Sequence, residues 1–115
     1  MKLLTIEIEK ELMKYGIDSQ KELVFQSKVI ARFFNPYGIG TWLITGGEKL
    51  KDGDWLLFGY VSLIYNEWGY ALLSEIESLT LSNGKPAIER DRYLSANTTV
   101  HDECVRLGIR KFENG

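Results

Sequence analysis

Hydrophobic residues in the middle of the chain fall into short runs that suit β-strands. Segments rich in β-branched and aromatic residues cover residues 28–34, 41–46, 55–65 and 69–73, and clusters of Gly, Asn, Asp and Pro separate them. Short runs of this composition, bounded by turn residues, are typical of strands joined by tight connections. The pattern predicts an antiparallel meander. Residues 87–93, where charges alternate, suit either a short edge strand or an extended segment.

The N-terminal segment has the periodicity of an amphipathic helix. Ile8 and Leu12 recur at helical spacing, and Thr5 precedes them in the position of an N-cap. Gly16 fits the C-terminal stop, because glycine adopts the backbone conformation that ends many helices. These signals predict a helix over residues 5–15.

Two further helices are expected after the strands. The four residues that begin at Ser74 have capping-box spacing, which predicts a short helix over residues 75–80. A last helix follows a cap at Thr98 or Thr99 and ends at Gly108. The expected fold class is therefore α+β: an antiparallel meander sheet of four to five strands with an N-terminal helix, a short middle helix and a C-terminal helix.

Composition narrows the class of protein without naming a function. The 115 residues are 44% hydrophobic and 26% charged, which is typical of one soluble globular domain over residues 1–115. The longest apolar run, residues 55–64, is about half of what a membrane-spanning helix requires, so no membrane is expected. Cys104 is the single cysteine and cannot form an internal disulfide, which favours a cytoplasmic location.

The segment at residues 55–65 is apolar on both sides, which a strand buried on one face does not require. Either helices cover both faces of the sheet, or one face is an uncovered aromatic surface. In the second interpretation, the exposed face binds another protein or forms a homodimer contact, because Trp and Tyr are favoured at interfaces. The aromatic residues considered for that role are Trp42, Phe58, Tyr60, Trp68 and Tyr70.

Catalytic and cofactor motifs are weak or missing in the sequence. There is no phosphate-binding loop, and no glycine-rich dinucleotide motif opens a helix. His101 is the only histidine, and with Cys104 it supplies two of the three or four ligands that a metal site needs. We therefore expect no metal and no cofactor. Cys104 is better interpreted as a small core residue on the apolar side of the last helix.

The densest charged stretch is Glu89–Arg92, which admits two interpretations. It forms a salt-bridged edge in which Arg90 anchors the preceding loop, or Arg90 and Arg92 join Arg32 and nearby aromatics to bind a phosphate or an acidic partner. Together with the aromatic surface, these interpretations give six candidate binding residues: Arg32, Phe34, Trp42, Tyr60, Arg90 and Arg92.

An ordered set of short segments over residues 3–94 resembles a bacterial family of domains of unknown function, whose members are short proteins often encoded by plasmids, phages and other mobile elements. The resemblance implies a compact α+β domain and a mobile-element context, and it implies no activity. Two departures stand out: Leu72 replaces the serine that the family tends to carry, and Ala87 is an extra residue. The segments are Leu3-Leu4-Thr5, Val29–Phe34 with Pro36, Thr41–Thr45, Phe58-Gly59, Gly69-Tyr70, Glu75–Leu79 and Pro86–Asp91.

Three functional hypotheses follow. The first is a small non-enzymatic accessory protein of a mobile element, such as an inhibitor of a host defence system, that contacts a protein partner through the aromatic sheet face. The second is a single-stranded nucleic-acid-binding protein, which the net charge of −2 disfavours. Its backbone contacts would come from Lys28, Arg32, Lys49 and Lys51. The third is an enzyme or small-ligand-binding domain that uses Glu89–Arg92.

Overall fold

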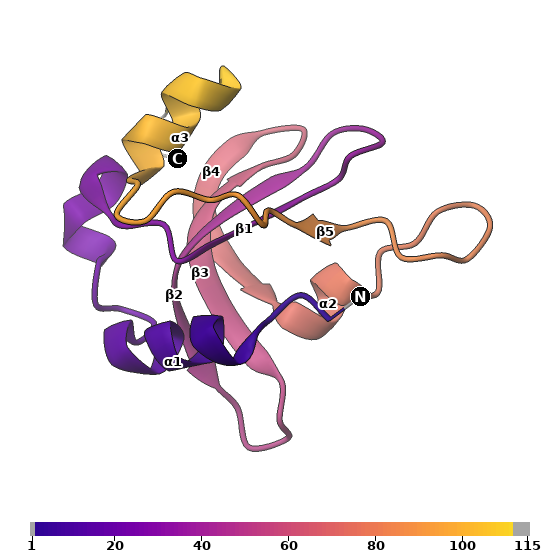
Figure 1. Cartoon of the computed structure of the whole chain (residues 1–115), viewed down its shortest axis with the longest axis horizontal. Helices are drawn as coiled ribbons and strands as arrows, with labels where there is room; N and C mark the ends of the chain where they lie inside the picture. Colours follow the sequence, from indigo (N-terminus) through magenta and orange to yellow (C-terminus); the bar gives the residue numbers. More distant parts are fainter. Residues whose placement is uncertain (1, 112–115) are drawn as a thin grey trace.

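The sheet has five antiparallel strands in the order β4-β3-β2-β1-β5 (Figure 1). The structure is a computed structural model and describes residues 2–111. The first four strands form a meander, and the chain then returns along the other side to place β5 beside β1. The strands are β1 (Ala31–Phe34), β2 (Thr41–Lys49), β3 (Trp55–Ser62), β4 (Asn66–Leu72) and β5 (Glu89–Arg90).

Helical segments flank this sheet and confirm the α+β class that the sequence predicts. The N-cap of the first helix is Thr5, whose hydroxyl accepts a hydrogen bond from the Ile8 N–H, and Gly16 ends the helix. Thr99 caps the last helix in the same way, and Gly108 ends it in the left-handed conformation. The helices are α1 (Ile6–Tyr15), the 3-10 helix η1 (Lys21–Gln26), α2 (Leu73–Glu77) and α3 (Val100–Leu107).

Several strand boundaries differ from the expected ones. The predicted strand at 55–65 ends at Ser62, because Leu63 turns back through a hydrogen bond from its N–H to the Tyr65 carbonyl. The next strand consequently starts at Asn66. β2 runs to Lys49 because a register shift between Ile44 and Gly46 lets the pairing with β3 continue past the bulge.

The middle helix begins earlier than predicted. Ser74 was the expected N-cap, but its N–H and hydroxyl both donate to the carboxylate of Asp54. The N-cap position falls on Leu72, whose N–H donates to the Glu75 carboxylate. Half of a capping box therefore remains at the position where the resembling family tends to carry serine.

Helices and loops cover a large part of both faces of the sheet. The larger core lies under α1, α2 and the N-terminal segment, and it includes Leu12, Phe33 and Trp42. A second core lies under η1 and α3, where Phe25 and Val100 pack on Tyr60. The first of the two interpretations is therefore correct for the centre of the sheet, and any interaction surface has to lie elsewhere.

Candidate functional site

Two of the six predicted binding residues belong to the cores. Trp42 is 5% exposed and Tyr60 is 0% exposed, and they point to opposite faces of the sheet. The prediction that they line an uncovered aromatic face is wrong, because the covering helices leave almost no surface at either residue. Tyr60 also donates its hydroxyl hydrogen bond to the Arg110 carbonyl, 2.7 Å away.

The predicted arginines do not converge on one open binding site: Arg90 and Arg92 line a pocket of about 230 Å³, whereas Arg32 is engaged by Asp91. Arg90 donates to the carbonyl oxygens of Lys2 and Leu3, at 2.9 and 3.1 Å, and so anchors the N-terminal segment. Arg32 donates to Asp91 and stacks its guanidinium over Phe34, 4.3 Å from the ring centroid. The structural interpretation of the Glu89–Arg92 stretch is thus supported, although Arg90 holds the N-terminal segment instead of the preceding loop.

Asp91 is the centre of the charged network at this edge. Its carboxylate accepts from Arg32 at 3.0 Å and from Arg106 of α3 at 3.5 Å. Burial raises the pKa of Asp91, but hydrogen bonds from the Tyr93 backbone N–H and the Arg32 guanidinium outweigh it. The pKa therefore lies below its ordinary value, and the ionised carboxylate holds β5, β1 and α3 together.

The cations proposed for nucleic-acid binding do not form a groove. Lys28 pairs with Glu11 at 3.2 Å and Arg32 pairs with Asp91. Lys49 and Lys51 lie at and just beyond the end of β2, where the chain turns into β3. Two of the four cations are thus paired with carboxylates, and the other two lie apart from them at the β2–β3 turn. The arrangement gives the nucleic-acid hypothesis little support.

Cys104 has the environment of a structural residue. Its side chain is buried in the core between α3 and the sheet, as the sequence predicts. Burial raises the pKa of the thiol to about 11. Since the thiolate is the reactive form, this cysteine is a poor nucleophile near neutral pH.

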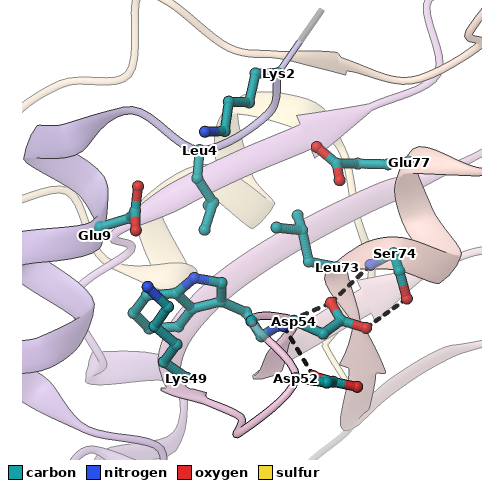
Figure 2. A pocket seen from close by; sticks show the side chains of 11 residues that line it. Lys2, Leu4, Glu9, Lys49, Asp52, Asp54, Leu73, Ser74 and Glu77 are labelled. Carbon is teal, nitrogen blue, oxygen red and sulfur yellow. Dashed lines mark hydrogen bonds between the residues drawn. The ribbon is translucent and has the colours of Figure 1, made fainter.

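A cavity of about 420 Å³ opens between the N-terminal segment, α1, α2 and the turn between β2 and β3 (Figure 2). Buried Leu4, Leu73 and Trp55 contribute to its lining. Charges of both signs surround these apolar residues: Lys2, Glu9, Lys49, Asp52, Asp54 and Glu77.

Several carboxylates of this cavity already accept hydrogen bonds from the protein. Asp54 accepts from the hydroxyl of Ser74 at 2.5 Å and from the Trp55 N–H at 2.8 Å, and Figure 2 shows Asp54 and Ser74 joined at one side. The hydrogen bond from Ser74 lowers the pKa of Asp54, which makes this carboxylate a weak base. Glu77 accepts from the Leu3 N–H. Within residues 2–111, no three His, Cys, Asp or Glu side chains cluster suitably for a metal ion.

A group of exposed apolar side chains lies instead at one end of the sheet. The β1–β2 and β3–β4 connections both turn there, next to the paired ends of β2 and β3, and their loops lie close together (Figure 1). A Cβ at Gly40 would lie 3.5 Å from the Leu63 side chain, so the loops are in contact range. We call the five large side chains on these loops the hairpin-tip patch: Tyr37, Ile39, Leu63, Ile64 and Tyr65, which are 69%, 73%, 44%, 85% and 78% exposed.

The hairpin-tip patch is uncharged as well as exposed to solvent. No Lys, Arg, Asp or Glu occurs in residues 33–47 or 55–66, which contain both tips. A shallow groove of about 240 Å³ runs beside it, lined by Val61, Glu67 and the second tip. The surface is thus suited to an apolar, uncharged counterpart.

A second aromatic surface lies beside it on the edge of the sheet. Phe58, Trp68 and Tyr70 form an edge aromatic cluster in which Phe58 stacks on Trp68, with ring centroids 5.8 Å apart. Lys21 of η1 lies over the rings of Phe58 and Tyr70, at 4.9 and 4.6 Å. The indole Nε1 of Trp68 is buried and has no hydrogen-bond partner among the described residues.

Comparison with known proteins identifies the family. A model of a family described as a protein of unknown function, DUF2958, matches residues 3–103. The chain belongs to DUF2958. Neither the curated proteins nor the solved structures contain a significant match. The match includes both hairpin tips, all of β4 and the Arg32–Asp91 pair, so these features lie within the DUF2958 domain, whereas Arg106 lies beyond the matched residues.

The DUF2958 match confirms the expected kind of family and supplies no activity. Within residues 2–111, none of the helices is both long enough and apolar enough to cross a membrane.

The sequence analysis did not predict the hairpin-tip patch, because residues 63–65 continue an apolar run and were assigned to a strand. Large apolar residues among the turn residues at 35–40 were the available signal.

Proposed function

We propose that this protein is a cytoplasmic accessory protein of a mobile genetic element, and that it acts by binding another protein through the hairpin-tip patch. The mobile-element context rests on the family resemblance, and the cytoplasmic location on the single, buried cysteine. One structural observation supports the binding role. Five large apolar side chains meet on two adjacent loops that contain no charge.

The patch fits the chemistry of a protein interface. Tyr and Ile supply a large contact area, and two tyrosine hydroxyls provide polar handles at its rim. Such a cluster costs solubility when it stays exposed, so a surface of this kind usually marks an interaction site. The partner's surface should be apolar at its centre, because the patch offers no charge that could pair with one.

A pair of aspartates in the patch tests the proposal. Ile39→Asp with Ile64→Asp places two charges at the contact, and both side chains point to solvent, so the fold should be unaffected. Proteins captured from a host lysate by the wild type are identified, and the strongest candidate is purified. Its Kd for the double variant should rise by a factor of about 30 or more, as expected when central interface residues are lost.

Ile6→Asp is the matched control. Ile6 is 67% exposed but lies at the first turn of α1, where an aspartate suits the helix dipole. This variant should bind the purified partner like the wild type. The proposal fails if no purified partner binds the wild type directly, or if the double variant binds as tightly as Ile6→Asp.

A further inference from the structure

Within residues 2–111, no strand pairs with the outer side of β4. It has seven residues, and it is the outermost strand on its side. The opposite edge is blunted, since β5 has only two residues. Native proteins usually protect long edges with lysine, proline or a bulge, and none of these occurs between Asn66 and Leu72.

The register shows which backbone groups of β4 point outward. Antiparallel strands alternate between residue pairs that exchange hydrogen bonds and pairs that do not. The Asn35 N–H donates to the Gly40 carbonyl, and this alternation can be followed through β2 and β3 to β4. It directs the N–H and C=O groups of Trp68 and Tyr70 away from β3. No hydrogen bond within residues 2–111 uses these outward groups.

Gly69, between these two residues, has no explanation within a single copy of the chain. A Cβ there would meet nothing within 4 Å, and its backbone does not need the conformations reserved for glycine. Glycine in a strand costs about 0.5–1 kcal/mol relative to alanine. Gly59, which pairs with Gly69 across the ladder, does have such an explanation: a Cβ at Gly59 would overlap the Leu43 carbonyl oxygen.

We propose that β4 pairs with β4 of a second copy, antiparallel, about a two-fold axis at Gly69. The two glycines would form a non-hydrogen-bonded pair, where the strands approach most closely. Trp68 of each copy would then exchange two backbone hydrogen bonds with Tyr70 of the other. Their rings lie on the same face and extend the edge aromatic cluster across the junction.

Like-charge repulsion disfavours a shift of the axis toward the start of β4. Glu67 is the only charged residue of β4. An axis at Gly69 places each Glu67 opposite Ala71, so the two carboxylates stay four positions apart. An axis at Trp68 would instead bring them within two positions of each other, where like charges repel.

Charge substitutions at the axis test the proposal. The wild type should be a dimer by sedimentation velocity at about 100 μM, where an interface with micromolar Kd is largely occupied. Gly69→Lys and Gly69→Glu should each weaken self-association tenfold or more, because two like charges then face each other. An equimolar mixture of the two variants should form dimers again. Glu67→Lys, which faces Ala71, is the control that should remain dimeric.

Two results would overturn the proposal: a monomeric wild type at this concentration, or a Gly69→Lys protein that dimerises like the wild type. Cross-linking provides a second measurement that does not depend on introducing a charge. Gly69→Cys should form an interchain disulfide under mild oxidation, since Cα atoms of facing residues lie within disulfide reach. Glu67→Cys should not, because four residues of strand, about 13 Å, separate the two cysteines. Equal cross-linking of the two variants would also contradict the proposed axis.

Discussion

Gly59 and Gly69 face each other across the β3–β4 ladder, yet they serve different purposes. At Gly59 the neighbouring strand comes so close that a Cβ would overlap the Leu43 carbonyl oxygen. At Gly69 the space beside the Cα is open. A glycine inside a strand usually marks a bulge or a close backbone approach, and Gly59 is a case of the second. The bulge lies nearby on β2, between Ile44 and Gly46.

Because of this difference, replacing each glycine by alanine should affect the free energy of unfolding in different ways. Gly59→Ala should lower the free energy of unfolding by about 2–4 kcal/mol, because backbone atoms have to move. Gly69→Ala should be neutral or raise it by about 0.5–1 kcal/mol, since glycine is unfavourable in a strand. Urea denaturation at one protein concentration measures both. Equal midpoints for the two variants would show that β2 and β3 are not packed as closely as described.

The environment of a single residue shows why the sequence did not predict which helices cover the sheet. Gln20 is 5% exposed and connects η1 to two segments: its amide donates to the carbonyls of Lys28 and Thr45 and accepts from the Lys28 N–H. The sequence presents Gln20 as one polar residue in a connection. Its buried role depends on the distant β2, which no local pattern reveals.

Among helices and strands, the features set by neighbouring residues were predicted correctly. The helix caps at Thr5 and Thr99 and the turns between strands are short-range features, and both caps are confirmed. The start of α2 was wrong because Asp54, twenty positions away, takes the donors of Ser74. The aromatic face was wrong at Trp42 and Tyr60 because burial there depends on helices distant in the sequence.

The Asp91 network gives the elements a pH-dependent connection. Asp91→Asn should reduce the free energy of unfolding at pH 7 by about 1–3 kcal/mol, because Arg32, whose side chain is 11% exposed, would lose its countercharge. The folded pKa of Asp91 is below the unfolded value of about 3.9. The stabilisation is therefore complete above the unfolded pKa and is lost as the pH falls through the folded pKa.

Denaturation series at pH 7 and below pH 4 check this sign. The gap between wild type and Asp91→Asn should be widest at pH 7 and should shrink in acid. Asp18→Asn is the control, since the Asp18–Lys21 ion pair is largely exposed and should contribute little at either pH. A gap that stays constant into acid would show that Asp91 does not stabilise the fold as a carboxylate.

In the whole molecule, pairing through β4 determines where the two hairpin-tip patches of a dimer lie. The hairpin-tip patch lies at the end of the sheet where β4 begins. Antiparallel pairing of β4 about Gly69 would therefore place the two patches at opposite ends of one continuous sheet. Each dimer would present two separate binding surfaces that face away from each other, so a partner at one end would not obstruct the other.

This arrangement predicts a stoichiometry that neither proposal predicts alone. With a purified monomeric partner, light scattering after size exclusion should give two partners per wild-type dimer and one per Gly69→Lys monomer. The Kd per site should be the same for both, because the two patches do not touch. A single partner per dimer, with one per Gly69→Lys monomer, would mean that the patches lie together. That result would place the dimer contact away from the β4 edge while leaving the hairpin-tip patch as the binding surface.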